Sequence, residues 1–317
     1  MKKASYLLLF ALSVFLFASC SSVRKSIFNL GLSIERCRSD LDYRTISVGG
    51  QRYAYLEREG DGDTIILLHG FAANKDSWIR FVRYVPLSYR VIVLDMPGHG
   101  DSRLDMNQTY TVEYVTEGVA TIIDSLGIDR FHLAGNSFGG LVSTLYAMDN
   151  SGRVITLGLF DAAGAASPVK SEFYRLLEKG DNPLLVASEE DFDRLMSFIF
   201  YKEPFIPWPG RPVLAGRFME RSDFNRKMWS DLFEGRLGES LNSRLAALSM
   251  PVFIIWGDHD RVLHVSSTKV YEEHIPDPSV VIMKDCGHAP MLERPDEAAM
   301  HYSNFLTAKR LDEKKRK

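Results

Sequence analysis

The chain has 317 residues, of which 45% are apolar and 25% are charged, and its formal net charge is −3. This length allows one large domain with an insertion, and the composition is that of a globular protein with a sizeable core. A slightly negative charge gives no general attraction to nucleic acid, so nucleic acid is not an expected partner. Nothing in the composition defines the oligomeric state.

Residues 1–20 predict an export signal. The chain begins with Met-Lys-Lys, and an apolar run follows at 6–18, which is short for a transmembrane helix. The segment Phe-Ala-Ser-Cys at 17–20 resembles the bacterial lipobox, whose cysteine is lipidated and becomes the new N-terminus. The resemblance implies an exported lipoprotein attached through Cys20 to a membrane of a bacterial envelope. The alternative is an ordinary cleaved signal, which would give a periplasmic or secreted protein.

Two further cysteines, Cys37 and Cys286, follow in the chain. In an exported protein they could form a disulfide, but two unpaired buried thiols are the favoured interpretation. No cluster of cysteine and histidine has the spacing of metal ligands, so neither a metal nor a cofactor is expected.

Residues 21–43 predict an amphipathic N-terminal segment. Ile27, Leu30 and Ile34 recur at spacings of three and four residues, and basic side chains lie between them. Such a helix could lie on a membrane surface below a lipid anchor. We favour the alternative, in which the helix packs on its own domain.

The pattern at 44–164 and 241–310 predicts one α/β core. It starts with a β-hairpin, in which two alternating runs flank Gly49-Gly50. Helical stretches, such as 112–126 and 138–148, then separate short apolar runs typical of buried parallel strands. We expect a mostly parallel eight-stranded sheet with helices on both faces. The predicted strands after the hairpin are 64–68, 90–95, 130–135, 154–160, 252–256 and 279–283.

Residues 165–240 interrupt this alternation with six prolines and several helical pieces. One helix start is clear at Ser188, which is followed by acidic residues in the manner of a capping box. An insertion at this point would lie above the carboxyl edge of the sheet, where open α/β sheets bind ligands. The segment is therefore predicted to be a helical cap or lid.

Ser137 is the candidate nucleophile. It is the centre of Gly135-Asn136-Ser137-Phe138-Gly139, with a predicted strand before it and a predicted helix after it. The turn between them must be tight, which requires the flanking glycines. The serine would also lie at a helix N-terminus, where backbone amides favour developing negative charge.

A serine nucleophile needs a base and an acid, which follow it in chain order in this arrangement. His288 comes after the last predicted strand and is the candidate base. Asp260 comes after the preceding strand and is the candidate acid, which would orient the imidazole. Asp258 is the first alternative, although we expect it to shape the turn. Asp161 is the second, although we expect a turn or hinge role beneath the cap.

Two backbone amides are needed to bind the oxyanion of a tetrahedral intermediate. The amide of Phe138, directly after the nucleophile, is one candidate. The other is Phe71, in the loop after the strand at 64–68. His69 is expected to support this loop.

Three motifs resemble those of bacterial lipolytic family V, of the related monoacylglycerol lipases and of the α/β-hydrolase superfamily. They are the loop at 68–78, the loop Asp-Met-Pro-Gly-His-Gly-Asp-Ser at 95–102 and the elbow at 135–140. In the cap, 182–192 and 201–207 are similar to the cap of the cold-active lipases of family V. The resemblance covers roughly residues 44–305. It implies the α/β-hydrolase fold and a lipase or esterase that cleaves acylglycerols or other lipid esters through an acyl-enzyme on Ser137.

Under this interpretation Phe198, Phe205 and Trp208 of the cap could line an acyl pocket, because such sites are mostly apolar. The alternative is that they form the cap's own small core. Two other functions remain as rivals: a carbon–carbon bond hydrolase of ring-cleavage products, which carries a similar elbow, and a ligand-binding homologue without turnover.

Overall fold

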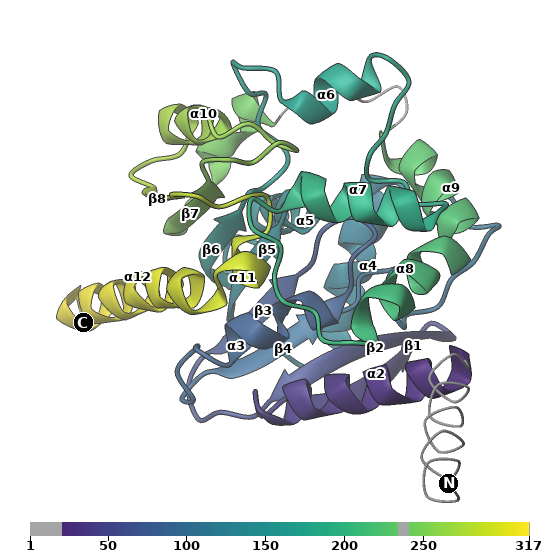
Figure 1. Cartoon of the computed structure of the whole chain (residues 1–317). Helices are drawn as coiled ribbons and strands as arrows, with labels where there is room; N and C mark the ends of the chain where they lie inside the picture. The colour runs from purple at the N-terminus through teal and green to yellow at the C-terminus, as the bar shows by residue number, and fades with distance from the viewer. Residues whose placement is uncertain (1–20, 234–240, 317) are drawn as a thin grey trace, which may run out of the picture.

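The computed structural model describes residues 21–233 and 241–316, and the predicted lipidation site Cys20 lies outside this range. An eight-stranded sheet runs through the described part in the order β1-β2-β4-β3-β5-β6-β7-β8 (Figure 1). The first two strands pair antiparallel with each other and β2 pairs antiparallel with β4, whereas all later pairings are parallel. The predicted mostly parallel eight-stranded sheet is therefore confirmed. The strands are β1 Asp42–Val48, β2 Gln51–Arg58, β3 Thr64–Leu68, β4 Arg90–Leu94, β5 Phe131–Asn136, β6 Val154–Phe160, β7 Val252–Gly257 and β8 Ser279–Met283.

The sheet separates two apolar cores, because successive side chains of a strand point to opposite faces. Ile66 and Leu68 of β3 belong to one core, and Ile65 and Leu67 belong to the other. The first core is covered by α4 Val112–Ser125, α5 Phe138–Asp149 and α10 Ser267–His274. The second core is covered by α3 Ile79–Val82, α11 Pro290–Glu293 and α12 Pro295–Arg316.

In the part of the chain that the structure describes, four α-helices lie between β6 and β7, in the segment predicted to be the cap (Figure 1). As expected, Ser188 caps one of them, α7, by accepting a hydrogen bond from the Asp191 amide. Two short 3-10 helices, Lys75–Trp78 and Asn242–Ala247, follow β3 and precede β7. The helices of the insertion are α6 Glu172–Leu177, α7 Glu189–Ile199, α8 Gly210–Glu220 and α9 Ser222–Phe233.

The amphipathic segment forms α2, Ser21–Cys37, which packs against α3 and α8. An ordinary packed helix would bury its apolar face, but in α2 the apolar side chains of Ile27, Leu30 and Ile34 are exposed. Cys37 is also exposed, whereas Cys286 is buried, and both thiols are unpaired. Among the described helices, none is long and apolar enough to cross a membrane.

Candidate active site

Ser137 lies in a strained turn between β5 and α5. Its φ of 54° is in the left-handed region that non-glycine residues seldom adopt. A Cβ on Gly135 would lie 2.2 Å from the carbonyl oxygen of Gly139, and a Cβ on Gly139 would lie 2.4 Å from that of His69. Both glycines are therefore required by backbone contacts, and the turn presents Ser137 at the carboxyl edge of the sheet.

Asn136, beside the serine, fastens this turn to the loop that carries His288. Its Nδ2 donates to the carbonyl oxygens of Phe160 at 3.0 Å and His288 at 3.1 Å. Because the asparagine is only 4% exposed, these bonds are shielded from water. The sequence places Asn136 inside the elbow motif but gives no indication of this bridge.

Asp260 and His288 form a buried pair across two loops. His288 Nδ1 lies 2.8 Å from Asp260 Oδ2, while Asp260 Oδ1 accepts the amides of Val262 at 2.8 Å and Leu263 at 2.9 Å. These bonds fix the carboxylate, and the carboxylate fixes the ring with Nε2 as its free nitrogen. Asp258, the first alternative, instead contacts the exposed His259 ring at 2.6 Å.

Asp161 lies beneath this pair. One of its oxygens accepts the Gly257 amide at 2.9 Å, and one ligand atom each of Asp161, Asp260 and His288 lies within 4.8 Å of the others. Burial raises the pKa of Asp161 well above its usual value, and the negative Asp260 raises it further. A protonated Asp161 can donate a hydrogen bond to Asp260. A metal ion at this group would compete with the bonds that already occupy both oxygens of Asp260.

The loop after β3 lies directly against Ser137. A Cβ on Gly70 would be 3.3 Å from Ser137 Cβ, so the residue before Phe71 touches the turn. Phe138 is the first residue of α5, so its amide has no partner within the helix. The two predicted oxyanion donors therefore belong to adjoining segments.

A buried charged network holds this loop from behind. Lys75 Nζ contacts Asp95 at 2.8 Å and Asp101 at 2.6 Å, and the Lys75 amide donates to Asp95 at 2.7 Å. His69 contacts the Gly70 carbonyl oxygen through Nδ1 at 2.8 Å and accepts the Met96 amide through Nε2 at 3.2 Å. This pattern needs a neutral ring, and burial lowers the pKa of His69 to about 3. His69 thus supports the loop, as expected from the sequence.

The three side chains predicted for an acyl pocket have different surroundings. Phe198 is 3% exposed and packs in a small core with Phe173 and Val262, whereas Phe205 and Trp208 are 80% and 61% exposed. The exposed pair is therefore not part of an enclosed pocket, because the chain between α7 and α8 carries it on the outer surface.

Two aromatic residues of α9 instead contact the predicted oxyanion residues. Trp229 and Phe233 pack edge-on against Phe71, with ring centroids 5.4 and 6.1 Å away, and Phe233 packs against Phe138 at 5.8 Å. No motif in the sequence distinguishes these two aromatic residues from others in the cap. They form an apolar wall against the rings of Phe71 and Phe138.

The cap is attached to the loops of His288 and Asp260 by polar contacts. The Ile199 carbonyl oxygen at the end of α7 accepts the His288 amide at 2.7 Å. The Glu293 carboxylate accepts the amides of Gly287 at 2.9 Å, Tyr201 at 3.1 Å and Lys202 at 2.7 Å. Glu293 therefore joins the chain after α7 to the loop of His288, and the sequence does not indicate this role.

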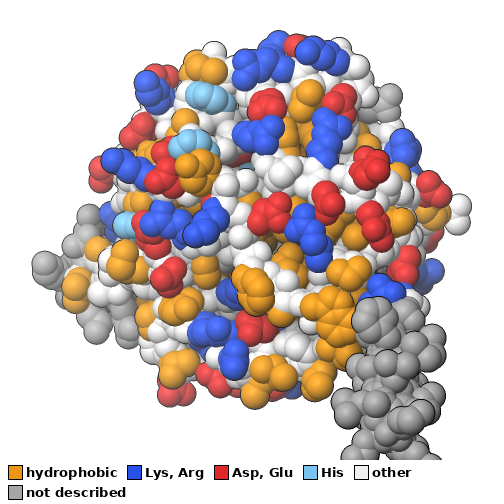
Figure 2. All heavy atoms as spheres, in the orientation of Figure 1, with side chains coloured by type: hydrophobic (Ala, Val, Ile, Leu, Met, Phe, Trp, Pro, Cys, Tyr) orange, Lys and Arg blue, Asp and Glu red, His pale blue; other side chains and the backbone are white. Residues whose placement is uncertain are grey.

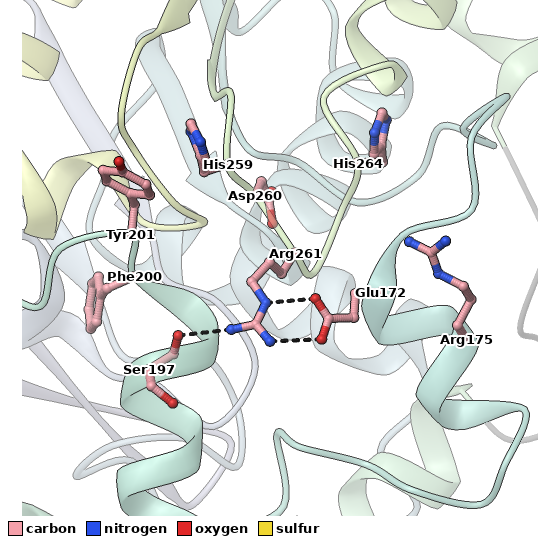
Figure 3. A pocket seen from close by; sticks show the side chains of 9 residues that line it. All are labelled: Glu172, Arg175, Ser197, Phe200, Tyr201, His259, Asp260, Arg261 and His264. Carbon is pink, nitrogen blue, oxygen red and sulfur yellow. Dashed lines mark hydrogen bonds and ion pairs between the residues drawn. The ribbon is translucent and has the colours of Figure 1, made fainter.

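A second attachment lies beside a cavity of about 340 Å³ whose wall includes Asp260 (Figure 3). There the Arg261 guanidinium makes two contacts of 2.7 Å to Glu172 of α6 and a 3.1 Å bond to the Ser197 carbonyl oxygen of α7. The helices α6 and α7 are thus both bound to Arg261, the residue after Asp260.

Comparison with known proteins extends over most of the chain. Residues 65–300 match the model of the alpha/beta hydrolase family. Lipase 1 of Psychrobacter immobilis is 31% identical over 86% of this chain and 87% of its own length, and the monoacylglycerol lipase abhd6-B of Xenopus laevis is 32% identical over 83% and 81%. The crystal structure of a bacterial virulence factor described as a membrane phospholipase A is 38% identical, with a TM-score of 0.88 over 98% of this chain and 99% of that chain. The chain therefore belongs to the alpha/beta hydrolase family.

Proposed function

We propose that this protein is a serine hydrolase that cleaves carboxylic esters of lipids. The observation that carries the proposal is the buried Asp260–His288 pair, 2.8 Å apart, in a loop fastened through Asn136 to the strained turn of Ser137. A serine, a base and an oriented acid are the parts that acyl transfer to water requires. The similarity to lipases and monoacylglycerol lipases supports the same reaction class.

In the first half of the reaction Ser137 Oγ attacks the ester carbonyl carbon while His288 Nε2 takes its proton. The carbonyl oxygen becomes an oxyanion, which accepts hydrogen bonds from the Phe71 and Phe138 amides. Asp260 holds the ring in the tautomer that leaves Nε2 free and stabilises the imidazolium. Collapse of the intermediate breaks the bond to the alcohol oxygen, which receives the proton from His288 and leaves.

In the second half a water molecule gives its proton to His288 and attacks the acyl-enzyme carbonyl. A second oxyanion forms at the same two amides, and its collapse releases the fatty acid and returns the proton to Ser137. Each proton that His288 accepts is given back, so the reaction needs no metal or cofactor.

For the substrate we propose acyl esters of glycerolipids, namely acylglycerols and phospholipids. The named lipases, monoacylglycerol lipase and membrane phospholipase A support this class. The acyl chain would pass the aromatic wall of Trp229 and Phe233, because these rings adjoin both proposed oxyanion donors. Residues 165–240 would act as the lid.

For the location we propose export and attachment to a membrane through a lipidated Cys20. The signal-like residues 1–20 support this, as does the similarity to a membrane phospholipase. Incorporation of labelled palmitate into the wild-type protein, and none into Cys20→Ser, is the expected result. Equal labelling of both would contradict the attachment site.

The decisive experiment for the reaction is labelling with a fluorophosphonate, which reacts with activated serines. We expect one adduct, on Ser137, and none in a folded Ser137→Ala variant, whose ester hydrolysis should fall by about 10⁶-fold. Absence of an adduct from the wild-type protein would refute the nucleophile. Monoolein, triolein and phosphatidylcholine, tested side by side, then separate the possible lipid substrates.

A further inference from the structure

The helix α2 is attached to the domain with its apolar side facing outward. On a surface helix of a globular protein the apolar stripe normally faces the core. In α2 the side chains of Ile27, Leu30 and Ile34, spaced by three and four residues, are 41%, 64% and 47% exposed. A side chain at Gly31, on the same side, would meet nothing within 4 Å.

The opposite side of α2 is attached to the domain by ion pairs and by the apolar side chains of Phe28 and Leu32. Arg36 binds Asp76 through two contacts of 2.7 and 2.8 Å, and both side chains are only 16% exposed. Glu35 binds Arg83 at 3.0 Å. Toward its N-terminus the helix is joined to α8, through Lys25 to Glu220 at 2.6 Å and through Asn29 to Arg217 at 2.7 Å. These contacts hold the helix in a rotation that leaves Ile27, Leu30 and Ile34 exposed.

Two exposed aromatic residues of the cap extend this surface. Phe205 is 80% exposed and Trp208 is 61% exposed. The segment that carries them lies against α2, because a Cβ on Gly210 would be 3.6 Å from the ring of Phe28. Figure 2 shows hydrophobic side chains gathered over α2 and the start of α8. We call Ile27, Leu30, Ile34, Phe205 and Trp208 the outer apolar surface.

We propose that the outer apolar surface is inserted into the interfacial layer of a lipid bilayer. The apolar run at 6–18 and Cys20 come immediately before α2, so the segment that directs the chain to a membrane ends where this surface begins. Aliphatic side chains on one helical face, with a tryptophan and a phenylalanine beside them, are typical of interfacial binding. The neighbouring cations Lys25, Arg36 and Arg38 are each paired with an acid.

The inference rests on the proposed lipid substrate for its biological purpose, but its test does not need turnover. The full chain contains four tryptophans. Trp78 and Trp256 are fully buried and Trp229 is half-buried in the cap, so Trp208 is the natural reporter. Phosphatidylcholine with brominated acyl chains quenches tryptophans that enter the bilayer. The protein is reconstituted into vesicles of this lipid, and its fluorescence is compared with that in unbrominated vesicles.

We expect strong quenching of the wild-type protein and weak quenching of Trp208→Phe. Adding Leu30→Trp to Trp208→Phe should restore the quenching. The matched control is Met300→Trp in the same background, at an exposed position of α12 outside the outer apolar surface, and it should remain unquenched. Equal quenching of the two introduced tryptophans, or quenching of neither, would overturn the proposal. A dimer that forms through position 30 without lipid would assign the surface to a second copy and would also overturn it.

The double variant Leu30→Glu/Ile34→Glu supplies a functional readout. Hydrolysis of lipid in vesicles should fall about tenfold or more, because each charge opposes insertion, while hydrolysis of a soluble short-chain ester stays unchanged. Loss of soluble hydrolysis as well would indicate a folding defect, and the fluorescence test with the tryptophan variants then decides. If the wild-type protein is quenched as expected but hydrolyses no ester, the proposed function fails and the docking surface stands.

Discussion

The carboxyl edge of the sheet and the cap above it are stabilised by different interactions. At the edge, a Cβ on Gly135 or Gly139 would lie within 2.4 Å of a backbone oxygen, and Ser137 between them has a φ of 54°. In the cap, the aromatic rings of α9 and a few polar bonds, such as those of Glu293 and Arg261, make the connection to the site. The edge is therefore expected to tolerate almost no change, whereas the cap can vary while the chemistry is retained.

The largest loss of activity, and one confined to the edge, is expected from a change at Asp260, the proposed acid. Asp260→Asn should lower kcat about 10⁴-fold with the fold intact, because the asparagine no longer stabilises the imidazolium or its required tautomer. Steady-state hydrolysis of a soluble ester measures kcat, and circular dichroism measures whether the fold is intact. The controls are Asp258→Asn and Asp161→Asn, in which we expect losses of tenfold or less. A larger loss in Asp161→Asn than in Asp260→Asn would assign the acid to Asp161.

The aromatic wall of the cap should give the next largest effect, and it should depend on chain length. Phe233→Ala removes ring contacts with Phe71 and Phe138, so kcat/KM for a twelve-carbon ester should fall by about 10–100-fold. A four-carbon ester should change much less. Phe205→Ala, on the exposed segment, is the matched control and should not alter either soluble ester. A uniform loss at all chain lengths would indicate damage to the oxyanion loop instead.

The elements of the edge and the places of its three proposed reacting residues are predictable from the sequence for a physical reason. A buried parallel strand must be apolar, and a turn that places Ser137 at a φ of 54° between close backbones must have small neighbours. Both requirements act over a few consecutive residues. The order of Ser137, Asp260 and His288 then follows from the order of the strands.

The cap could not be predicted to the same depth. Phe205 and Trp208 are as aromatic as Trp229 and Phe233, and only the paths of the chain before α8 and of α9 decide which rings contact Phe71 and Phe138. Similarly, α2 has the amphipathic pattern of a packed helix, yet Ile27, Leu30 and Ile34 are exposed and the attached side includes the ion pair of Arg36. Patterns give the period of a helix but not its rotation, which long-range ion pairs such as Arg36–Asp76 determine.

The free energy of unfolding should depend on pH through His69, which lies behind the edge in the loop after β3. Its pKa is lowered by burial to about 3, so the unfolded chain binds a proton that the folded chain does not. The stabilisation from keeping the ring neutral is complete above pH 6.5 and is lost as the pH falls toward 3. At pH 5 the loss is about 2 kcal/mol in the free energy of unfolding. Urea unfolding at pH 7 and pH 5 measures it, and His69→Gln should reduce the pH difference by this amount; an unchanged difference would contradict the neutral ring.

The smallest effect is expected at Glu293, where the cap and the edge meet. In the wild type the two carboxylate oxygens of Glu293 accept three backbone amides. In Glu293→Gln only one oxygen remains, and the new amide group is placed against a backbone donor. We expect kcat to fall up to about tenfold for short and long esters alike, because the His288 loop loses its link to the end of α7 while the aromatic wall is unchanged. Glu297→Gln is the matched control, since Glu297 pairs with Arg294 and His301 and not with a cap residue. If Glu293→Gln instead changes KM for long esters alone, the carboxylate holds the lid against substrate and does not position the base. If both variants match the wild type, the cap is connected to the site chiefly through its apolar contacts.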